Sequence, residues 1–432
     1  MKKCVTAVLV GAGLRGAHVY SQYALDHPDE LKVVAVAEPD RTKRERFAAQ
    51  HGIGEEMQFT GYDGLFSREK LADCAMICTQ DRMHYEPVKL ALERGYHVLC
   101  EKPMSPDKKE IVEMGALAGK YGRILSVCHV LRYSPFFSRI KELLDEGRIG
   151  RLMTIQHIEE VGYWHHAHSF VRGNWRNAEE SSPMILQKCC HDMDILLWLC
   201  GSRCTRLSSF GALTYFRREN APADAPEYCM DGCAHRETCP FYAPRFYLEH
   251  ERAVEDGLVY AVLEQERAEV VEETVEEAAD PLKPEVILGA LRRGPYGRCV
   301  FHCDNTVVDH QTVDMEFENG VTASFLMTAF TNQCARRIRL MGTKGELKGD
   351  MEAGVIEVID FASGEEQKIQ LHTPSKGHSG SDERMMQNFV RMVSEGTSGR
   401  TDAAVSVESH LMALAAEEAR VSGRVVRVFQ SA

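Results

Sequence analysis

The residues best suited to chemistry stand in the run Val98-Leu99-Cys100-Glu101-Lys102-Pro103. Residues 96–100 are apolar apart from His97, and the strand that they predict ends in a carboxylate, an amine and a proline. In an open α/β sheet, ligands bind in the crevice beyond the carboxyl ends of the strands. A lysine at such a strand end can hydrogen-bond a substrate hydroxyl, and Pro103 can fix the turn through a cis peptide bond. The alternative is a surface lysine before a turn proline, a common pattern without a catalytic role.

A glycine motif near the N-terminus predicts a dinucleotide site. The apolar residues 5–10 are followed by Gly11-Ala12-Gly13-Leu14-Arg15-Gly16 and by a helical pattern over residues 17–25. The glycines allow a tight turn and close approach of the backbone to a pyrophosphate, which the helix N-terminus attracts. A second strand, residues 31–37, ends at Glu38, whose carboxylate can bind the adenosine ribose hydroxyls and repel a 2′-phosphate. NAD is therefore favoured over NADP, although basic side chains follow at Arg41, Lys43 and Arg44.

Strands and helices alternate through the first 130 residues. A third strand, residues 73–78, runs into Thr79-Gln80-Asp81-Arg82-Met83-His84, and a helix over residues 85–94 follows. After the strand that precedes Lys102 come a helix over residues 107–121 and a strand over residues 124–130. This alternation predicts a doubly wound parallel sheet. His84 either neighbours a helix N-terminus or lines the cofactor site, because it lies just beyond a strand end.

These motifs together resemble the Gfo/Idh/MocA oxidoreductase family, named for glucose–fructose oxidoreductase and inositol dehydrogenase. The resemblance rests on the glycine turn at residues 11–16, on Thr79 with His84 five residues on, and on the run Gly95-Tyr96-His97-Val98-Leu99-Cys100-Glu101-Lys102-Pro103. It implies an α/β protein with an N-terminal NAD-binding Rossmann domain, residues 1–126. The C-terminal α+β domain, residues 127–432, would contain a large, mostly antiparallel, open-faced sheet.

The resemblance also assigns roles to residues. It implies that Lys102 takes part in proton transfer from the substrate hydroxyl, and that the Trp175-Arg176 pair lies near the nicotinamide and the substrate. The predicted cofactor-binding residues are Gly11, Gly13, Leu14, Arg15, Gly16, Glu38, Thr79, Gln80, His84, Glu101, Lys102, Trp175 and Arg176.

A second run with chemical capacity is Gln187-Lys188-Cys189-Cys190-His191-Asp192-Met193-Asp194. The resemblance implies an Asp four residues before a His at this place; His191 matches the His, but Gln187 stands at the Asp position. An imidazole titrates near neutral pH and suits reversible proton transfer, whereas a Gln cannot accept a proton. We therefore predict Lys102 and His191 as catalytic residues, with Gln187 and Lys188 as further substrate-binding residues. The alternative for His191 is a structural histidine that caps a buried helix.

Two features of the second domain invite a metal interpretation. The segment Tyr163-Trp164-His165-His166-Ala167-His168 contains three histidines. On an extended segment adjacent side chains point to opposite sides, so we expect polar loop residues that face a sugar rather than a metal site. Three cysteines, Cys229, Cys233 and Cys239, are spaced more loosely than in a zinc knuckle, and a fourth ligand could come from His235, Cys204, Cys299 or Cys303. Metal binding there stays open, with free buried thiols as the favoured alternative.

These cysteines belong to an insertion at residues 217–297, relative to the layout that the resemblance implies. Its second part, residues 249–280, is rich in glutamate and predicts a solvated helix face or a mobile excursion. Beyond the insertion, Asn319-Gly320 between residues 312–318 and 321–328 predicts a hairpin. Further strands are predicted over residues 337–341, 345–349 and 425–429, and helices over residues 381–396 and 404–422.

Composition limits the classes of function. A net charge of −13 argues against broad binding to nucleic acids or anionic membranes. No apolar run approaches the length of a membrane span, and the short apolar run after Lys2 and Lys3 predicts a strand better than a signal peptide. Fifteen cysteines without a secretory signal indicate thiols or ligands in a reducing cytoplasm.

We therefore predict a cytoplasmic, NAD-dependent oxidoreductase that acts on a secondary hydroxyl of a sugar, cyclitol or glycoside, as a homo-oligomer (dimer or tetramer). One alternative is an NAD-dependent glycoside hydrolase without net redox change, which relatives of the family exemplify. A second alternative is a non-catalytic, NAD-binding regulator, against which the presence of Lys102 and His191 argues.

Overall fold

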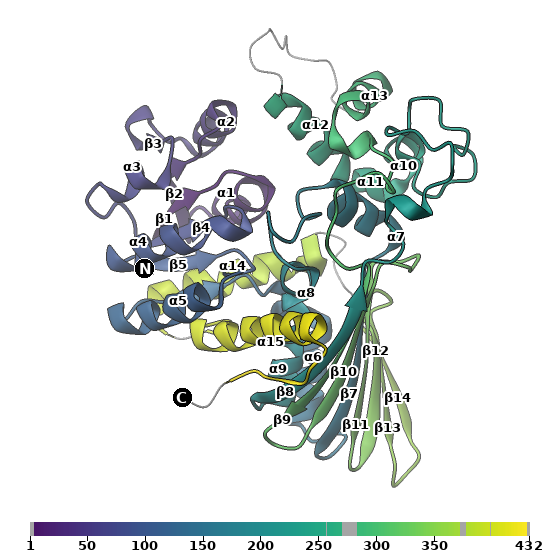
Figure 1. Cartoon of the computed structure of the whole chain (residues 1–432). Coiled ribbons are helices and arrows are strands. Elements are labelled where there is room, and N and C mark those ends of the chain that lie inside the picture. Colours follow the sequence, from purple (N-terminus) through teal and green to yellow (C-terminus); the bar gives the residue numbers. More distant parts are fainter. Residues whose placement is uncertain (1–3, 256, 270–282, 372–376, 398, 430–432) are drawn as a thin grey trace.

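The computed structural model describes residues 4–255, 257–269, 283–371, 377–397 and 399–429, and the chain folds around two β-sheets (Figure 1). The first sheet has six parallel strands in the order β3-β2-β1-β4-β5-β6. This is the order of a Rossmann sheet, so the predicted doubly wound parallel sheet is confirmed, with its topological switch point between β1 and β4. The strands are β1 (Val5–Val10), β2 (Leu31–Ala37), β3 (Gln58–Phe59), β4 (Cys74–Ile77), β5 (His97–Cys100) and β6 (Leu125–Val127).

Two predicted elements of this sheet differ from the structure. The single helix expected over residues 17–25 is wrong, because a π-helical segment begins at Leu14, within the glycine turn, and an α-helix starts after Ser21. The amide of Ser21 bonds to the carbonyl of Gly16, which widens the last turn of the π-helical segment. The strand expected over residues 124–130 ends at Val127. The helices are η1 (Leu14–Tyr20), α1 (Gln22–Asp26), α2 (Arg41–His51), η2 (Glu55–Met57), α3 (Tyr62–Phe66), η3 (Asp81–Met83), α4 (Tyr85–Glu93), α5 (Lys108–Tyr121) and η4 (Val130–Tyr133).

The second sheet has nine strands in the order β14-β13-β12-β11-β7-β10-β9-β8-β15. All its neighbours pair antiparallel except β7 and β10, so the predicted mostly antiparallel sheet is confirmed. The Asn319-Gly320 hairpin joins β9 and β10 as expected, while β8, β13 and β14 were not predicted. The strands are β7 (Leu152–Glu160), β8 (Cys204–Ala212), β9 (His310–Phe317), β10 (Thr322–Thr328), β11 (Ala335–Gly342), β12 (Gly345–Asp350), β13 (Val355–Asp360), β14 (Glu366–Gln370) and β15 (Val426–Arg427).

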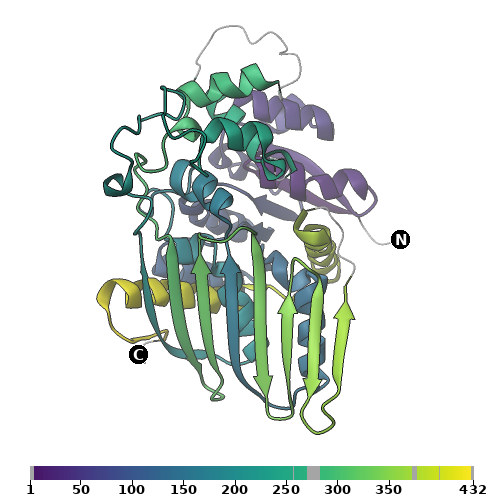
Figure 2. The ribbon, with the colours of Figure 1, turned by 90° about the vertical axis from the view of Figure 1, so that its right-hand side faces the viewer.

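Helices cover one face of this sheet and leave the other open, as Figure 2 shows. The covering helices bury the larger core of the chain. The open face carries polar side chains at adjoining register positions, such as Gln156, Arg339 and Lys348. The predicted homo-oligomer would use this face, and it stays a prediction. The covering helices are α6 (Pro135–Asp145), α8 (Met184–Gln187), α9 (Cys190–Cys200) and α15 (Ala403–Ser422).

The two late helices connect the sheets. Helix α14 (Gly377–Glu395) packs against β1 and η1, so Met385, Met386 and Phe389 belong to the core of the parallel sheet. Helix α15 packs against α5 on one side and against α9 and β8 on the other. The division into domains at residue 126 stays a prediction, and the C-terminal helices contribute to both cores. Within the described ranges, no helix combines the length and the apolar character needed to cross a membrane.

The insertion forms a small helical unit at one end of the second sheet, beside α7 (Tyr163–His166) (Figure 1). Its helices pack around Trp164 of α7, Tyr247 and Leu291. The predicted glutamate-rich helix face corresponds to α11 and α12, while residues 270–280 lie outside the described residues. The elements are η6 (Arg218–Asn220), α10 (Ala243–Glu249), α11 (Glu251–Glu255), α12 (Leu258–Glu269), α13 (Pro284–Arg293) and η7 (Pro295–Gly297).

Candidate active site

The glycine turn after β1 has the geometry that a dinucleotide needs. Gly11 has a φ of 90°, and a Cβ there would lie 2.6 Å from the carbonyl oxygen of Cys78. A Cβ at Gly16 would collide with the carbonyl oxygen of Gly11, whereas a Cβ at Gly13 would meet nothing within 4 Å. Gly11 and Gly16 are therefore required by packing, and Gly13 leaves room for close approach to the backbone. Leu14, the first residue of η1, is exposed beside it. These residues fit NAD.

Glu38 lies directly beside the glycine turn. Its Oε2 accepts a hydrogen bond from the amide of Ala12 at 2.8 Å, and its Oε1 accepts one from the amide of Asp40 at 3.0 Å. The two bonds fix the buried carboxylate at the end of β2, where it retains lone pairs for a ribose hydroxyl. Arg44 donates to the main-chain carbonyl of Glu38 at 2.6 Å, so its guanidinium is engaged with the backbone. This arrangement supports the predicted preference for NAD.

Arg15 and Glu101 join the glycine turn to the end of β5. Arg15 Nε lies 3.0 Å from Glu101 Oε1, and Arg15 Nη2 lies 2.5 Å from Asp382 Oδ1 of α14. The hydroxyl of Tyr20 donates to the same Glu101 oxygen. Burial opposes the charge of Glu101, but Arg15 and Lys102 outweigh it and lower its pKa. Arg15 and Glu101, both predicted to bind the cofactor, thus bond to each other and hold η1 against the strand that precedes Lys102.

Two buried histidines hold the turn after Lys102, whose bond to Pro103 is cis. Nδ1 of His84 lies 2.7 Å from the carbonyl oxygen of Pro103, and its Nε2 lies 2.9 Å from that of Thr79. His410 of α15 accepts a hydrogen bond from the amide of Met104 through Nε2 at 3.0 Å. His84 is therefore a clamp between two strand ends, with both ring nitrogens bonded to main-chain carbonyls. Thr79 Oγ1 donates to the carbonyl of Met83, and Gln80 precedes η3 in the same loop.

Lys102 reaches from the parallel sheet to the segment that contains His191. Its Nζ donates to the carbonyl oxygen of Gln187 at 2.8 Å, and its amide donates to Glu101 Oε2 at 2.7 Å. Gln187 is the last residue of α8, and His191 lies in the first turn of α9. The structure thus brings Lys102 to the segment that contains His191, although the two residues are almost ninety positions apart in the chain. Lys188 and Cys189 lie between the two helices, so Lys188 and His191 do not belong to one continuous helix.

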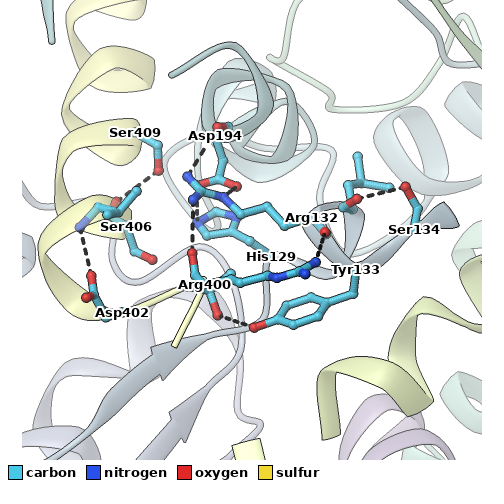
Figure 3. Close-up of polar contacts among 12 residues, drawn as sticks. His129, Arg132, Tyr133, Ser134, Asp194, Arg400, Asp402, Ser406 and Ser409 are labelled. Atoms are coloured by element: carbon cyan, nitrogen blue, oxygen red, sulfur yellow. Dashed lines mark hydrogen bonds and ion pairs between the residues drawn. The ribbon is translucent and has the colours of Figure 1, made fainter. Parts of the chain in front are cut away.

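A largely buried network surrounds His129, Arg132 and Asp194 (Figure 3). The ring of His129 packs edge-on against that of His191, at 5.8 Å between centroids, and lies 5.3 Å from that of His410. Burial, with Arg132 and Lys102 nearby, lowers the pKa of His129 well below its usual value. Arg132 binds Asp194 of α9 through Nε at 2.6 Å and Nη2 at 2.8 Å.

A second network surrounds Lys188. Its Nζ lies 3.4 Å from Glu159 Oε1, and Arg336 Nη2 lies 2.8 Å from Glu159 Oε2. Arg336 also binds Asp192 of α9 through Nε and Nη2, and His157 bonds to the same carboxylate at 2.7 Å. Burial opposes the charge of Lys188, but Cys334 and Glu159 outweigh it and raise its pKa. Lys188 is therefore held in its charged form.

The three histidines predicted on an extended segment lie instead on the helices α7 and η5 (Ala167–Arg172). Gly162, with a φ of 81°, lets the chain turn directly from β7 into α7. His166 and His168 are buried among aromatic rings, and burial lowers the pKa of His166 to about 4 and that of His168 to about 3. His165 alone approaches the candidate site, with Nδ1 3.6 Å from Cys334 Sγ. The extended segment was a wrong prediction, and only one of the three rings stands near Lys188.

Trp175 and Arg176 have different surroundings. The indole nitrogen of Trp175 is buried and makes no hydrogen bond to any described residue, which leaves a donor for a ligand. Arg176 forms a bidentate pair with Asp304, at 2.9 and 3.1 Å, and also lies 3.8 Å from Glu180. The guanidinium of Arg176 is therefore engaged within the protein, and its role toward NAD stays a prediction.

One cysteine of the insertion, Cys229, contacts Arg172, which is fully buried. Its Nη2 lies 3.6 Å from Cys229 Sγ and 2.7 Å from the carbonyl oxygen of Phe241. All fifteen cysteines of the chain are free thiols. In the part of the chain that the structure describes, no group of three or more His, Cys, Asp or Glu side chains is arranged to hold a metal ion.

Sequence reasoning missed several residues that build the site. His410 lies 306 residues beyond Met104, and nothing in its amphipathic helix distinguishes it. Glu159 and Arg336 did leave a signal: both are charged residues at inward positions of strands, and they are direct cross-strand partners in β7 and β11. A charge at an inward position of a strand requires a partner, and here the partner is the facing residue.

The six-stranded parallel sheet and its glycine turn define a protein of the NAD-binding Rossmann type. Two family models match the chain: "Oxidoreductase family, NAD-binding Rossmann fold" over residues 5–129, and "GFO/IDH/MocA C-terminal domain" over residues 137–230. Together they cover about half of the chain. The chain belongs to the Gfo/Idh/MocA oxidoreductase family, as the sequence motifs predicted.

Individual relatives are more distant. Inositol 2-dehydrogenase 4 of Saccharopolyspora erythraea is 30% identical over 239 residues, which are 52% of this chain and 60% of the relative's length. A solved oxidoreductase from Agrobacterium radiobacter, in complex with NAD+, L-tartaric acid and magnesium, has a TM-score of 0.67 at 15% identity and 98% coverage of both chains. Levoglucosan dehydrogenase, in complex with NADH and levoglucosan, has a TM-score of 0.69 at 16% identity, covering 99% of this chain and 100% of the other. These structures share the fold.

Proposed function

We propose that this protein is an NAD-dependent dehydrogenase that oxidises a secondary hydroxyl of a sugar, cyclitol or glycoside. The observation that carries the proposal is the bond from Lys102 Nζ to the carbonyl oxygen of Gln187, which places the amine at the segment of His191. NAD, when bound at the glycine turn, supplies the hydride acceptor. The inositol dehydrogenase and levoglucosan dehydrogenase among the similar proteins support a polyhydroxylated substrate.

The chain's own residues provide the acid–base chemistry. Lys102 and His191 bind the substrate hydroxyl and remove its proton, while the two clamps on residues 103 and 104 hold the amine in place. Gln187 has no carboxylate to take part, so the proton passes between the amine and the imidazole alone. We also propose that the enzyme is cytoplasmic and that it pairs with a second copy of itself through the open face of the second sheet.

The test follows nicotinamide absorbance when the protein and NAD meet a panel of sugars, cyclitols and aryl glycosides, with products analysed in parallel. Lasting NADH that is lost in Lys102→Met, by about 10²–10⁴-fold in kcat, would support the dehydrogenase. The affinity for NAD should stay within a few-fold in that variant; a folded variant that no longer binds NAD would show that Lys102 is structural. Aglycone release without lasting NADH would replace the proposal with the redox-neutral glycosidase.

Cofactor preference has its own test. Glu38→Ala removes the negative charge that would face a 2′-phosphate, and it should shift the ratio of NAD to NADP affinity toward NADP by about 10-fold or more. Isothermal titration with both cofactors measures this ratio. An unchanged ratio would remove the role assigned to Glu38.

A further inference from the structure

The charged cluster around Lys188 has its carboxylates inside and its cations toward the surface. The side chains of Glu159 and Asp192 are 0% exposed, whereas those of Lys188 and Arg336 are 16% and 12% exposed. Both cations are held from behind by these carboxylates. Among the described residues, neither Lys188 Nζ nor Arg336 Nη1 donates a hydrogen bond, and neither atom is fully enclosed. The cluster therefore presents unused cationic donors.

These donors adjoin the proposed catalytic pair. Lys102 Nζ bonds to the carbonyl of Gln187, the residue directly before Lys188. His165 Nδ1 lies 3.6 Å from Cys334 Sγ beside this cluster, and the pKa of His165 is lowered by burial and then by the charge of Lys188. Taken together, Lys102, Lys188 and Arg336 against Glu159 and Asp192 leave one net positive charge.

We propose that the substrate is a sugar acid, whose carboxylate binds Lys188 and Arg336 while its hydroxyl is held by Lys102 and His191. This inference rests on the proposed function. Charged donors bind a carboxylate through short, strong hydrogen bonds, and here Nη1 of Arg336 and the amine of Lys188 would each bind a carboxylate oxygen. A single net positive charge suits a monoanionic carboxylate better than a phosphate dianion. Despite burial, Cys334 and Glu159 raise the pKa of Lys188, and Asp192 and Glu159 raise the pKa of Arg336, so both cations stay charged when substrate enters.

The test measures binding to the wild-type protein saturated with NADH, in which no oxidation occurs. Isothermal titration compares matched probes: D-glucuronate with D-glucose and methyl glucuronate, and D-galacturonate with D-galactose and methyl galacturonate. Glucose 6-phosphate and galactose 6-phosphate are included. At least one acid should bind about 10-fold or more tighter than its neutral partner and its ester, since hydrogen bonds to charged groups contribute about that much. Lys188→Gln should remove most of this preference, and Lys188→Arg should retain it.

A matched control is Lys368→Gln, which removes an exposed lysine 3.6 Å from Glu357 on the far edge of the sheet and should leave the preference unchanged. Thermal unfolding confirms that each variant is folded. The proposal is overturned if no acid exceeds its neutral partner, whether both bind or neither does, or if a sugar phosphate binds more tightly than every acid. If an acid binds more tightly than its neutral partner but no probe is oxidised in the presence of NAD, the proposed dehydrogenase function fails and the carboxylate site stands.

Discussion

Asp194 and Asp192, two residues apart on α9, belong to two ion-pair networks that differ in their exposure to solvent. Asp194 binds Arg132, and both side chains are enclosed, at 1% and 4% exposed. Asp192 binds Arg336, which is 12% exposed and adjoins Lys188. The Asp194 network therefore lies wholly inside the protein, while the Asp192 network extends to the surface near Lys102.

The difference lies in which donors are used. Arg132 donates through all three nitrogens of its guanidinium, to Asp194 and to the carbonyl oxygen of Arg400 (Figure 3). Within the described residues Arg336 donates only through Nε and Nη2. A network whose donors are all satisfied inside the protein can only hold elements together, and this one fixes η4 to α9. A network in which some N–H groups of the cations make no hydrogen bond within the protein can also bind a ligand.

Breaking the enclosed network should have the largest effect. Arg132→Met leaves Asp194 buried without its cation, and such a change destabilises a protein by about 3–5 kcal/mol. Urea unfolding measures the loss. The control is Arg139→Met on α6, which removes a partly exposed arginine paired with the exposed Glu142 and should change the free energy of unfolding by less than about 1 kcal/mol. Equal effects of the two changes would contradict the distinction between the networks.

His410 adjoins the enclosed network, and its substitution tests the turn after Lys102. Its Nε2 accepts from the amide of Met104 while its Nδ1 bonds to the carbonyl of Ser406. A Gln reaches the position of Nε2 with its amide oxygen, whereas an Asn reaches only the position of Nδ1. We expect His410→Asn to lower kcat by about 10–100-fold and His410→Gln to lower it much less, with NAD affinity unchanged in both. A similar kcat in the two folded variants would mean that the bond to Met104 does not position Lys102.

Local patterns were enough to predict the parallel sheet and to place Lys102 at a strand end, whereas His191 was predicted from the family resemblance. The glycine turn, Glu38 and Lys102 all follow apolar strands directly, and the carboxyl ends of parallel strands meet at one edge of the sheet. The hairpin at Asn319-Gly320 was predicted for a similar reason, because its turn chemistry is local. Where residues next to each other in sequence determine the structure, the sequence was sufficient.

The rest depended on contacts between distant segments. The helical course of residues 163–172 follows from packing of Trp164 and His168 against the insertion, which no local pattern reveals. The roles of His84 and His410 as clamps depend on carbonyl and amide groups of Pro103 and Met104. Since such bonds involve the main chain of another segment, residue types alone could not predict them.

The free energy of unfolding at acid pH should depend on histidines, such as His410, that burial keeps neutral. Burial, with His129 nearby, lowers the pKa of His410 to about 3. The folded protein thus binds fewer protons than the unfolded chain, whose histidines titrate near 6.5, and stability falls as the pH drops below that value. Between about pH 6 and pH 4, His410 should contribute up to about 1.4 kcal/mol of loss per pH unit. Urea unfolding over this range gives the free energy of unfolding at each pH. In His410→Gln the slope of this free energy against pH should be smaller by the equivalent of about one proton. An unchanged slope would mean that His410 is protonated in the folded protein.

The smallest change in stability is expected at Lys188, where binding is proposed to be affected most. Lys188→Gln leaves Glu159 with its bond to Arg336, and water reaches the partly exposed side chain at position 188, so the buried carboxylate is not left without a cation. We therefore expect the free energy of unfolding, measured with urea, to fall by about 1 kcal/mol or less, compared with about 3–5 kcal/mol for Arg132→Met. A loss as large as that at Arg132 would show that Lys188 is part of the structural framework. A small loss would show that its charge is not needed for folding, as expected for a residue whose charge serves a ligand.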